Sequence, residues 1–291
     1  AENSIGRIWL ESYPSSAFKS EMKYYVDEAK QEPDVEEKLE SIRYRNVNPE
    51  EIKIIEPCSG SGHILVYCFD LLLHMYQEKG YSKKDIPSLI LKNNLVGLDI
   101  DQRATQLASF ALVMRARSID NKFFDEGRYV RPKVYEIIDS KALAKCDYSG
   151  KSYKEIINEY NSKQWNGENQ LTVDELKAIE YLVDLFDDAK IIGSLLKVNP
   201  GKYLTIRKKL ITNLKEKTQV DIFTSAFFDY EFKDLLEILR VAYFMVQKYD
   251  VMITNPPYIG ISTLDINPKD YLSKNYTNSK SDMFAMFMET P

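Results

Sequence analysis

Cysteine and histidine are scarce in this sequence, and the shortage excludes several kinds of site. The three cysteines, Cys58, Cys68 and Cys146, form no Cys-x-x-Cys pair and have no histidine cluster beside them. Such usage favours reduced thiols in a cytosol and predicts no metal site. With only two histidines, the chain has little raw material for a triad built on histidine.

Long apolar runs and an excess of positive charge are also missing. No stretch approaches the roughly 20 apolar residues of a membrane-spanning helix, and no signal-peptide pattern is present. We therefore expect a cytoplasmic protein with no membrane partner. The formal net charge of −5 argues against a general nucleic-acid-binding face, so any basic clamp for DNA is local or lies outside this chain. Both ends read as internal sequence, which predicts a fragment of a longer protein.

The central feature of the sequence is an apolar run that breaks into Asn255-Pro256-Pro257-Tyr258. The run predicts a buried strand over 249–253. Two consecutive prolines prevent the strand from continuing, because they lack the N–H that pairing needs. The motif therefore predicts a rigid platform at the carboxyl end of a strand, where open α/β sheets place their ligands.

This platform suits attack by an aromatic amine, whose lone pair is delocalised into its ring. The side-chain oxygen of Asn255 and the carbonyl of Pro256 can accept the two N–H bonds of one amino group and stabilise the positive charge that develops. Tyr258 can stack on the ring that carries the amine. The alternative is a strand followed by a proline turn and a packing tyrosine.

A second motif lies between a strand predicted over 52–55 and a strongly apolar helix. It reads Glu56-Pro57-Cys58-Ser59-Gly60-Ser61-Gly62. A strand, a small-residue loop and a helix form the first unit of a doubly wound fold. The glycines let a ligand approach the backbone, and the helix start offers free N–H groups. No Gly-Lys-Ser/Thr follows, so the loop is no phosphate P-loop and better suits a ligand with an amino acid end, such as S-adenosylmethionine. The alternative is a plain strand-to-helix turn.

Carboxylates end the next two predicted strands. The strand over 95–98 ends on Asp99, which is placed to accept hydrogen bonds from the ribose hydroxyls of a nucleoside cofactor, with Ile100 lining the adenine. Asp101 is instead expected to cap the following helix. The strand over 134–138 ends on Asp139, which is either a contact to the adenine amine or a turn and capping residue.

Helical periodicity accounts for much of the remaining sequence. A helix is predicted over 104–116, with a core stripe of Leu107, Phe110, Ala111 and Met114. Over 145–247 the strand signals lapse, which predicts a helical insertion. Within this insertion, the capping box Thr172-Val173-Asp174-Glu175 predicts the start of one helix. A basic run over 207–209 is expected on a solvated face.

Two further segments carry structural expectations. Residues up to 48 read as helical and charged, with an acidic, solvated stretch over 27–40 and Trp9, Leu10, Phe18 and Tyr24 as packing residues. The polar stretch over 261–279 suits a flexible loop that closes over a substrate.

These patterns predict an α/β fold with a mostly parallel sheet and a helical insertion. The predicted parts are an N-terminal helical segment (1–50), the cofactor half of a domain (51–144), the helical insertion (145–247), and the catalytic strand with its loop and following helix (248–291).

In this order the motifs resemble those of the amino DNA methyltransferases that are specific for the N6 position of adenine. The resemblance is to the class in which the cofactor motif precedes the catalytic motif. The runs Glu-Pro-Cys-Ser-Gly-Ser-Gly-His-Ile-Leu-Val, Val-Gly-Leu-Asp-Ile-Asp-Gln-Arg-Ala and Lys-Ser-Asp-Met-Phe-Ala-Met-Phe are most like the large adenine-specific methyltransferases of BREX phage-defence systems. The resemblance covers most of the chain from Asn3 onward and implies a Rossmann-like, S-adenosylmethionine-dependent methyltransferase fold.

The resemblance also implies roles for residues. Glu56, Ser59, Gly60 and Gly62 would hold the methionine end of the cofactor. Asp99 and Ile100 would hold its ribose and adenine, and Asp139 would lie near the adenine. Asn255, Pro256 and Tyr258 would bind a target adenine in double-stranded DNA, within a restriction-modification or BREX-type system whose other proteins are potential partners. The family's Tyr-Thr-Pro segment, its last strands and its target-recognition domain have no counterpart here, so DNA contacts are expected mostly outside the chain.

Two other interpretations compete. Methyltransferases that act on a glutamine amide of release factors or on guanine amines of ribosomal RNA also carry Asn-Pro-Pro-Tyr, although they are usually small and have no long insertion. A catalytically silent module that senses the cofactor is the alternative from a different class, and the intact Asn255 and Asp99 argue against it.

Overall fold

The computed structural model describes most of the chain and divides it into two compact units. The first contains Ala1–Leu98, Gln102–Val134 and Lys248–Asn255, and the second contains Asp99–Asp101, Tyr135–Gln247 and Pro256–Pro291. The described residues are 1–144, 153–163, 165, 167–218, 222–279 and 282–289. Cys146 and the first residues of the predicted insertion lie outside them.

A four-stranded sheet with the order β3-β2-β1-β4 is the framework of the fold. Its strands are β1 (Ile54–Glu56), β2 (Leu95–Asp99), β3 (Lys133–Glu136) and β4 (Val251–Met252). β1 runs parallel to both of its neighbours, β2 and β4. The predicted α/β fold with a mostly parallel sheet is confirmed, and the strands differ from the predicted ranges only at their ends.

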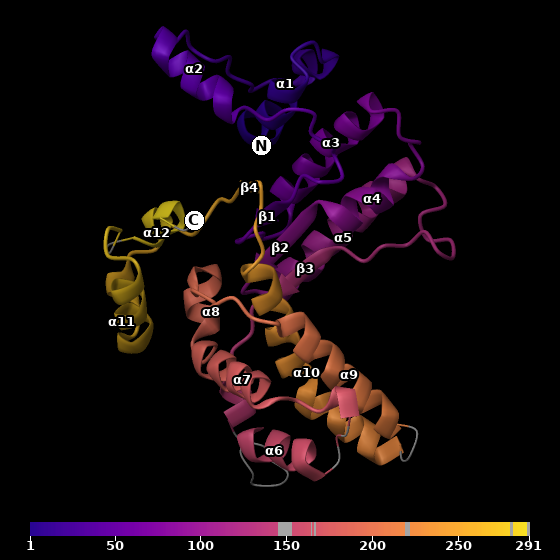
Figure 1. The fold of residues 1–291 in the computed structure, drawn as a ribbon, viewed down its shortest axis with the longest axis vertical. Coiled ribbons are helices and arrows are strands. Elements are labelled where there is room, and N and C mark those ends of the chain that lie inside the picture. Colours follow the sequence, from indigo (N-terminus) through magenta and orange to yellow (C-terminus); the bar gives the residue numbers. More distant parts are fainter. Residues whose placement is uncertain (145–152, 164, 166, 219–221, 280–281, 290–291) are drawn as a thin grey trace. The chain divides into compact units, whose positions relative to one another are not determined.

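Two helices connect β1 to β2 in the first unit, α3 (His63–Glu78) and α4 (Ile86–Asn93), and both lie beside the strands (Figure 1). α3 is apolar on most of its surface and is correspondingly buried. After its end, Gly80 takes a φ of +80°, a conformation that suits glycine. This long helix, turn and short helix account for the large separation between Gly62 and Asp99.

The prediction for the next helix, α5 (Gln102–Ile119), is right about the helix and wrong about its buried face. The predicted stripe is exposed: Leu107 is 53% exposed, Phe110 60% and Met114 48%. The buried residues of α5 lie on a different face of the helix: Thr105, Ala108, Leu112 and Ala116. A Cβ built on Gly62 would lie 2.7 Å from the Cβ of Ala108, so this face comes too close to the loop for larger side chains.

The N-terminal segment is helical and packs on α3. It contains η1 (Glu2–Gly6), α1 (Arg7–Ser12), η2 (Ala17–Glu21) and α2 (Pro33–Ile42). Trp9, Leu10 and Phe18 are buried as predicted, whereas Tyr24 is 74% exposed, so its predicted packing role is wrong. The backbone N–H of Tyr24 donates to the buried carboxylate of Glu2, which fixes the main chain there while the ring faces solvent. α2 has no buried residue, which confirms the solvated stretch.

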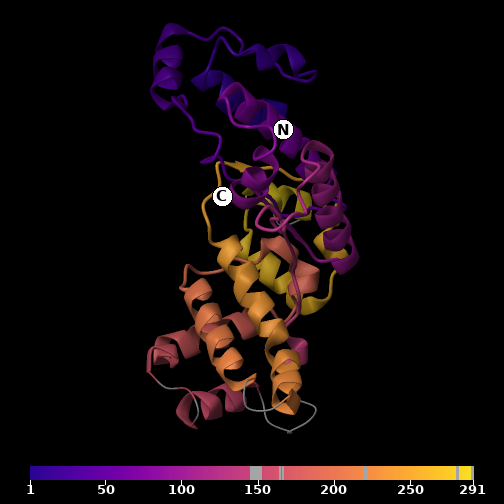
Figure 2. The same cartoon turned by 90° about the vertical axis from the view of Figure 1, so that its right-hand side faces the viewer.

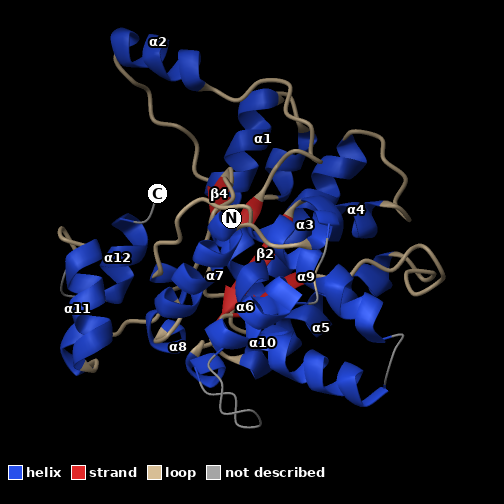
Figure 3. Cartoon of the chain, turned by 60° about the horizontal axis from the view of Figure 1, so that its bottom comes forward, coloured by secondary structure: helices blue, strands red, loops and turns tan. Residues whose placement is uncertain are grey.

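The second unit is mostly helical in its described residues, as Figure 3 shows. α9 and α10 lie side by side (Figures 1 and 2). The predicted capping box of α7 is present, with reciprocal bonds between Thr172 and Glu175. No helix in the described part of the chain has the length and apolar character that a membrane span requires. The elements of this region are η3 (Lys141–Ala144), α6 (Tyr153–Lys163), η4 (Gly167–Asn169), α7 (Val173–Leu185), α8 (Ala189–Ile192), η5 (Gly193–Leu195), α9 (Tyr203–Thr218) and α10 (Ile222–Met245).

The basic run on α9 is less solvated than predicted. Arg207 is half-buried and its Nε donates to the carbonyl of Leu236 at 3.0 Å. Lys209 pairs with Glu175 at 2.8 Å, and only Lys208 is exposed. The solvated-face prediction is therefore wrong for Arg207 and Lys209, because their long side chains satisfy groups on neighbouring helices.

The stretch after the Asn-Pro-Pro-Tyr motif is helical. It forms η6 (Ile261–Thr263) and α11 (Ile266–Asn275), and α12 (Met283–Glu289) follows. The hydroxyl of Tyr276 donates to the carbonyl of Leu195 at 2.7 Å. The hydroxyl of Tyr271 accepts from the backbone N–H of Lys197 at 2.8 Å. The predicted flexible loop over 261–279 is therefore wrong, because tyrosines that read as part of a substrate lid instead anchor α11 on residues 195–197.

Candidate methyltransferase site

The loop after β1 folds into a tight turn at the start of α3. Glu56 ends the strand and is buried at 2% exposure. The N–H of Ser59 donates to the carbonyl of Leu98 on the neighbouring strand at 2.8 Å, and the N–H of Gly62 donates back to Ser59 at 2.8 Å. Gly60 and Gly62 have φ values of +49° and +82°, which explains why glycine occupies both positions.

The two loop glycines differ in their surroundings. A Cβ on Gly60 would meet nothing within 4 Å, so the backbone there is open to approach by a ligand. At Gly62 the space is filled by Ala108, and glycine is required for packing as well as for its φ. Gly97 on β2 is equally crowded, since a Cβ there would lie 3.2 Å from the Cβ of Ser59. These contacts hold the loop in one conformation.

Ser59 carries a polar atom that the protein itself leaves unsatisfied. The residue is 4% exposed, and its Oγ has no hydrogen-bond partner among the described residues. Burying such a hydroxyl without a partner costs about 1–3 kcal/mol. Together with the open backbone at Gly60 and the first N–H groups of α3, this oxygen fits a bound group with an amino acid end.

In the second unit, Asp99 is the last residue of β2 as predicted, and Ile100 follows it directly. The Oδ1 of Asp99 accepts from the backbone N–H of Asp101 at 2.9 Å, which turns the chain into α5. Ile100 is 42% exposed, and Asp101 stands directly before the first residue of α5, the position of an N-cap. The carbonyl of Asp99 accepts from the N–H of Ile137 at 2.8 Å, so the ends of β2 and β3 are joined.

Asp139 makes a contact of the capping kind. Its Oδ1 accepts from the backbone N–H of Lys190 at 2.7 Å, at the start of α8. One of the two interpretations of this residue is therefore seen directly, and a role at the adenine amine stays a prediction. Sequence patterns gave no reason to single out Lys190, because the contact joins residues that are 51 positions apart.

The Asn-Pro-Pro-Tyr motif lies at the end of β4. The N–H of Ile253 donates to the carbonyl of Ile55 at 3.0 Å, and the chain leaves the sheet there. Asn255 is exposed and Pro256 is buried. Because β4 and β1 are adjacent and parallel, Asn255 follows the same edge of the sheet at which the loop after Glu56 begins.

Beyond the prolines, in the second unit, Tyr258 is 73% exposed and stacks on Phe284, with ring centroids 5.4 Å apart and an interplanar angle of 22°. Gly260 pairs with Asp282 in an isolated bridge, and the N–H of Met283 donates to Ile259 at 3.1 Å. The start of α12 thus supports the end of the motif. The sequence predicted a helix after the catalytic strand but did not indicate Phe284 as a partner of Tyr258.

Comparison with known families decides what kind of protein carries this arrangement. The family model described as the Eco57I restriction-modification methylase matches residues 93–290, well over half of the chain. The chain belongs to the Eco57I restriction-modification methylase family. The resemblance drawn from the motifs is thereby confirmed at the level of the family.

Two curated relatives align with 99% of the chain. One is the adenine-specific methyltransferase BrxX of Escherichia coli O9:H4 (strain HS), which is 34% identical over 293 residues. The other is the adenine-specific methyltransferase PglX of Lacticaseibacillus casei (strain Zhang), 31% identical over 297 residues. The alignments cover 24% and 23% of these proteins, so the chain spans about a quarter of their length.

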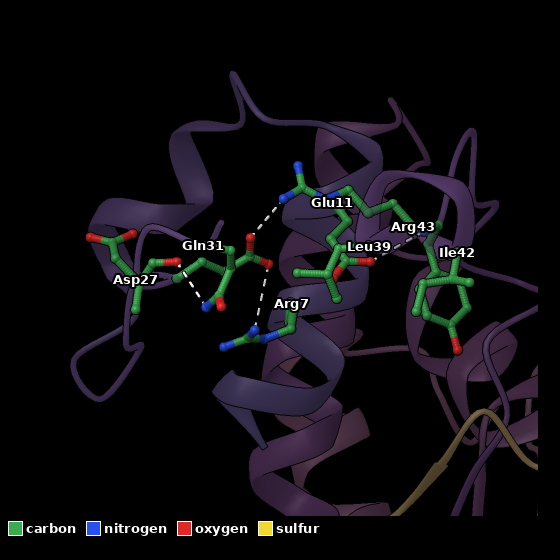
Figure 4. A pocket seen from close by; sticks show the side chains of 10 residues that line it. Arg7, Glu11, Asp27, Gln31, Leu39, Ile42 and Arg43 are labelled. Carbon is green, nitrogen blue, oxygen red and sulfur yellow. Dashed lines mark hydrogen bonds and ion pairs between the residues drawn. The ribbon is translucent and has the colours of Figure 1, made fainter. Parts of the chain in front are cut away.

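Two cavities of the chain are lined by none of the predicted site residues, although the second includes Ser61 and His63, the neighbours of Gly62. One, of about 420 Å³, is lined by the N-terminal segment, where Glu28 pairs with Arg43 at 2.7 Å and with Arg7 at 3.5 Å (Figure 4). The other, of about 470 Å³, lies between α3 and α5 and includes His63 and Leu107. Neither includes a predicted cofactor residue. Within the described residues, no three potential metal-ligating side chains form a cluster.

Proposed function

We propose that the full-length protein transfers a methyl group from S-adenosylmethionine to the N6 amine of adenine in DNA, within a BREX-type phage-defence system. The observation that carries the proposal is the position of Asn255-Pro256 three residues beyond the end of β4, which pairs with the strand that leads into the Ser59–Gly62 turn. The names of both relatives, which are adenine-specific methyltransferases, favour this substrate over a glutamine amide or a guanine.

In this proposal, residues at the ends of β1, β2 and β3 hold the cofactor. The unpartnered Oγ of Ser59, the open backbone at Gly60 and the first N–H groups of α3 bind its methionine end, with Glu56 as the acceptor for its amino group. Asp99 accepts from the ribose hydroxyls, and Ile100 packs on the adenine. When bound, the cofactor supplies a methyl group on a positively charged sulfur.

The catalytic residues act on the target amine by position and charge. The adenine leaves the DNA stack and lies beside Tyr258, whose exposed ring offers it a stacking surface. The side-chain oxygen of Asn255 and the carbonyl of Pro256 accept its two N–H bonds, aim the nitrogen lone pair and stabilise the positive charge that develops on transfer. Pro257 keeps the following chain extended, so that Tyr258 lies at a fixed position.

The wider biology follows from the same proposal. Double-stranded DNA is bound mostly by parts of the longer protein outside this chain, in keeping with the net charge of −5. Other proteins of the defence system are proposed partners, and the cytoplasm is the proposed location. The chain itself is proposed to divide into the N-terminal segment, cofactor half, insertion and catalytic part predicted from its sequence.

The test is Asn255→Ala in the full-length protein. We expect N6-methyladenine formation to fall by at least about a hundredfold, the scale seen when one preorganised polar group is removed, while S-adenosylmethionine affinity stays within about twofold. Asn158→Ala, an exposed asparagine on α6, is the matched control and should retain activity. Labelling of DNA by Asn255→Ala at the wild-type rate would contradict the proposal.

A further inference from the structure

The ring of Tyr258 is largely exposed to solvent, yet an aromatic side chain from α12 lies against it. Tyr258 is 73% exposed, and its ring stacks on that of Phe284 with centroids 5.4 Å apart and an interplanar angle of 22°. Aromatic pairs favour such an offset, nearly parallel arrangement. Both residues belong to the second unit. Phe284 therefore restricts the rotation of a ring that is otherwise mostly surrounded by water.

The backbone that follows Tyr258 is held by hydrogen bonds to the start of α12. The N–H of Met283 donates to the carbonyl of Ile259 at 3.1 Å, and Gly260 pairs with Asp282 in an antiparallel bridge. On the other side of Tyr258, the two prolines of the motif restrict the backbone. These contacts determine where the side chain of Tyr258 begins, and the orientation of its ring depends on what the ring touches.

Asp282 connects this backbone to the position of Phe284. Its main chain forms the bridge to Gly260, while its Oδ1 accepts from the backbone N–H of Phe284 at 2.8 Å. Asp282 directly precedes Met283, the first residue of α12, so this bond is an N-cap. One aspartate therefore joins the end of the motif to the helical turn that carries Phe284.

The buried face of α12 gives Phe284 a fixed base. Met283, Met286 and Phe287 are 5%, 0% and 4% exposed, and Phe284 lies beside this stripe with its side chain partly buried. A side chain can orient a binding group only if it is itself held in place by packing. The seated helix meets this condition, and the proposed function so far gives it no task.

We propose that Phe284 is a positioning residue for methyl transfer, which holds the ring of Tyr258 in the orientation that receives the target adenine, and that Asp282 sets Phe284 in place. This inference rests on the proposed function. The base then stacks on a ring that is already oriented, so less side-chain freedom is lost when the base binds. Phe284 acts through Tyr258 and takes no part in the chemistry of the amine.

The experiment is a double-mutant cycle on Tyr258 and Phe284 that measures the rate of N6-methyladenine formation by the full-length protein. Phe284→Ala should lower this rate by about two- to tenfold, the effect of losing one aromatic pair, and Phe284→Tyr should restore it. Tyr258→Ala should lower the rate by about ten- to a hundredfold, the effect of losing one ring on which a base stacks. Adding Phe284→Ala to Tyr258→Ala should cause less than about a twofold further loss, because no ring is left to position.

Two controls separate positioning from folding. The affinity for S-adenosylmethionine, measured by calorimetry, should stay within about twofold in every variant. Met288→Ala, at a 73% exposed position of the same helix, should leave the methylation rate unchanged.

A second pair of variants tests the cap independently of the ring. Asp282→Ala should lower the methylation rate by about two- to tenfold, as Phe284→Ala does. Asp282→Asn should retain the wild-type rate, because an asparagine oxygen can accept the same N-cap bond.

The outcomes distinguish this inference from the proposed function. If the wild-type protein forms no N6-methyladenine, or Asn255→Ala forms it at the wild-type rate, the proposed function itself fails. The positioning role alone is refuted, and the proposed function stands, if Phe284→Ala behaves as Met288→Ala does. The same conclusion follows if the losses from Phe284→Ala and Tyr258→Ala multiply in the double variant, or if Phe284→Ala also weakens binding of S-adenosylmethionine.

Discussion

Glu2 holds the N-terminal segment in place because three hydrogen-bond donors converge on its carboxylate. The residue is 3% exposed and accepts from the backbone N–H groups of Lys23 and Tyr24 and from the hydroxyl of Tyr67 on α3. A glutamate usually faces water, so the sequence around Glu2 gives no sign that this residue is buried and holds other elements in place. The bond to Glu2, followed by burial, raises the pKa of Tyr67 to about 12.

The raised pKa makes one contribution to stability dependent on alkaline pH. Tyr67 is more readily ionised in the unfolded chain, at its ordinary pKa of 10.0, than in the folded protein. Its stabilising bond is therefore fully present below pH 10 and is lost as the pH rises toward 12. We expect the stability difference between wild type and Tyr67→Phe, measured by urea unfolding, to shrink across this window. A difference that stays constant from pH 8 upward would contradict the assignment.

At the scale of the helix, α5 shows that periodicity alone does not identify the buried face. Its sequence contains two stripes at helical spacing, and the structure buries the one with alanines, which allows the close approach to Gly62. The larger side chains of the other stripe are left on the surface, and two of them, Leu107 and Met114, line the cavity beside α3.

The same substitution at two positions of α5 tests this assignment. Leu112→Ala should lower the free energy of unfolding by about 2–5 kcal/mol, because Leu112 is 1% exposed and its removal leaves a cavity. Leu107→Ala should change it by less than about 0.5 kcal/mol, as expected of an exposed position. Urea unfolding of both variants gives the comparison. A greater loss of stability for Leu107→Ala than for Leu112→Ala would contradict this assignment and favour the buried face predicted from periodicity.

At the scale of the whole chain, charge and length bear on DNA binding. The 44 acidic residues outnumber the 39 basic ones, and Arg207 and Lys209 are engaged by neighbouring helices. We expect this chain alone to bind duplex DNA more weakly than a Kd of about 10⁻⁴ M at physiological salt, the weak end of non-specific binding. Fluorescence anisotropy measures this, with the full-length protein as the positive control. Micromolar, salt-sensitive binding by the chain alone would show that it carries its own DNA clamp.

The sequence by itself determined the strands, the two motifs at their ends and the family. These features depend on local rules: β4 ends at Met252, shortly before two prolines that cannot pair in a sheet, and glycines permit the turn over 59–62. Only the tertiary structure decided which face of α5 is buried, that α11 is anchored on residues 195–197, and that Gly193 reaches Ile100. These outcomes depend on contacts between residues far apart in the chain, and such contacts leave no local pattern for a single sequence to reveal.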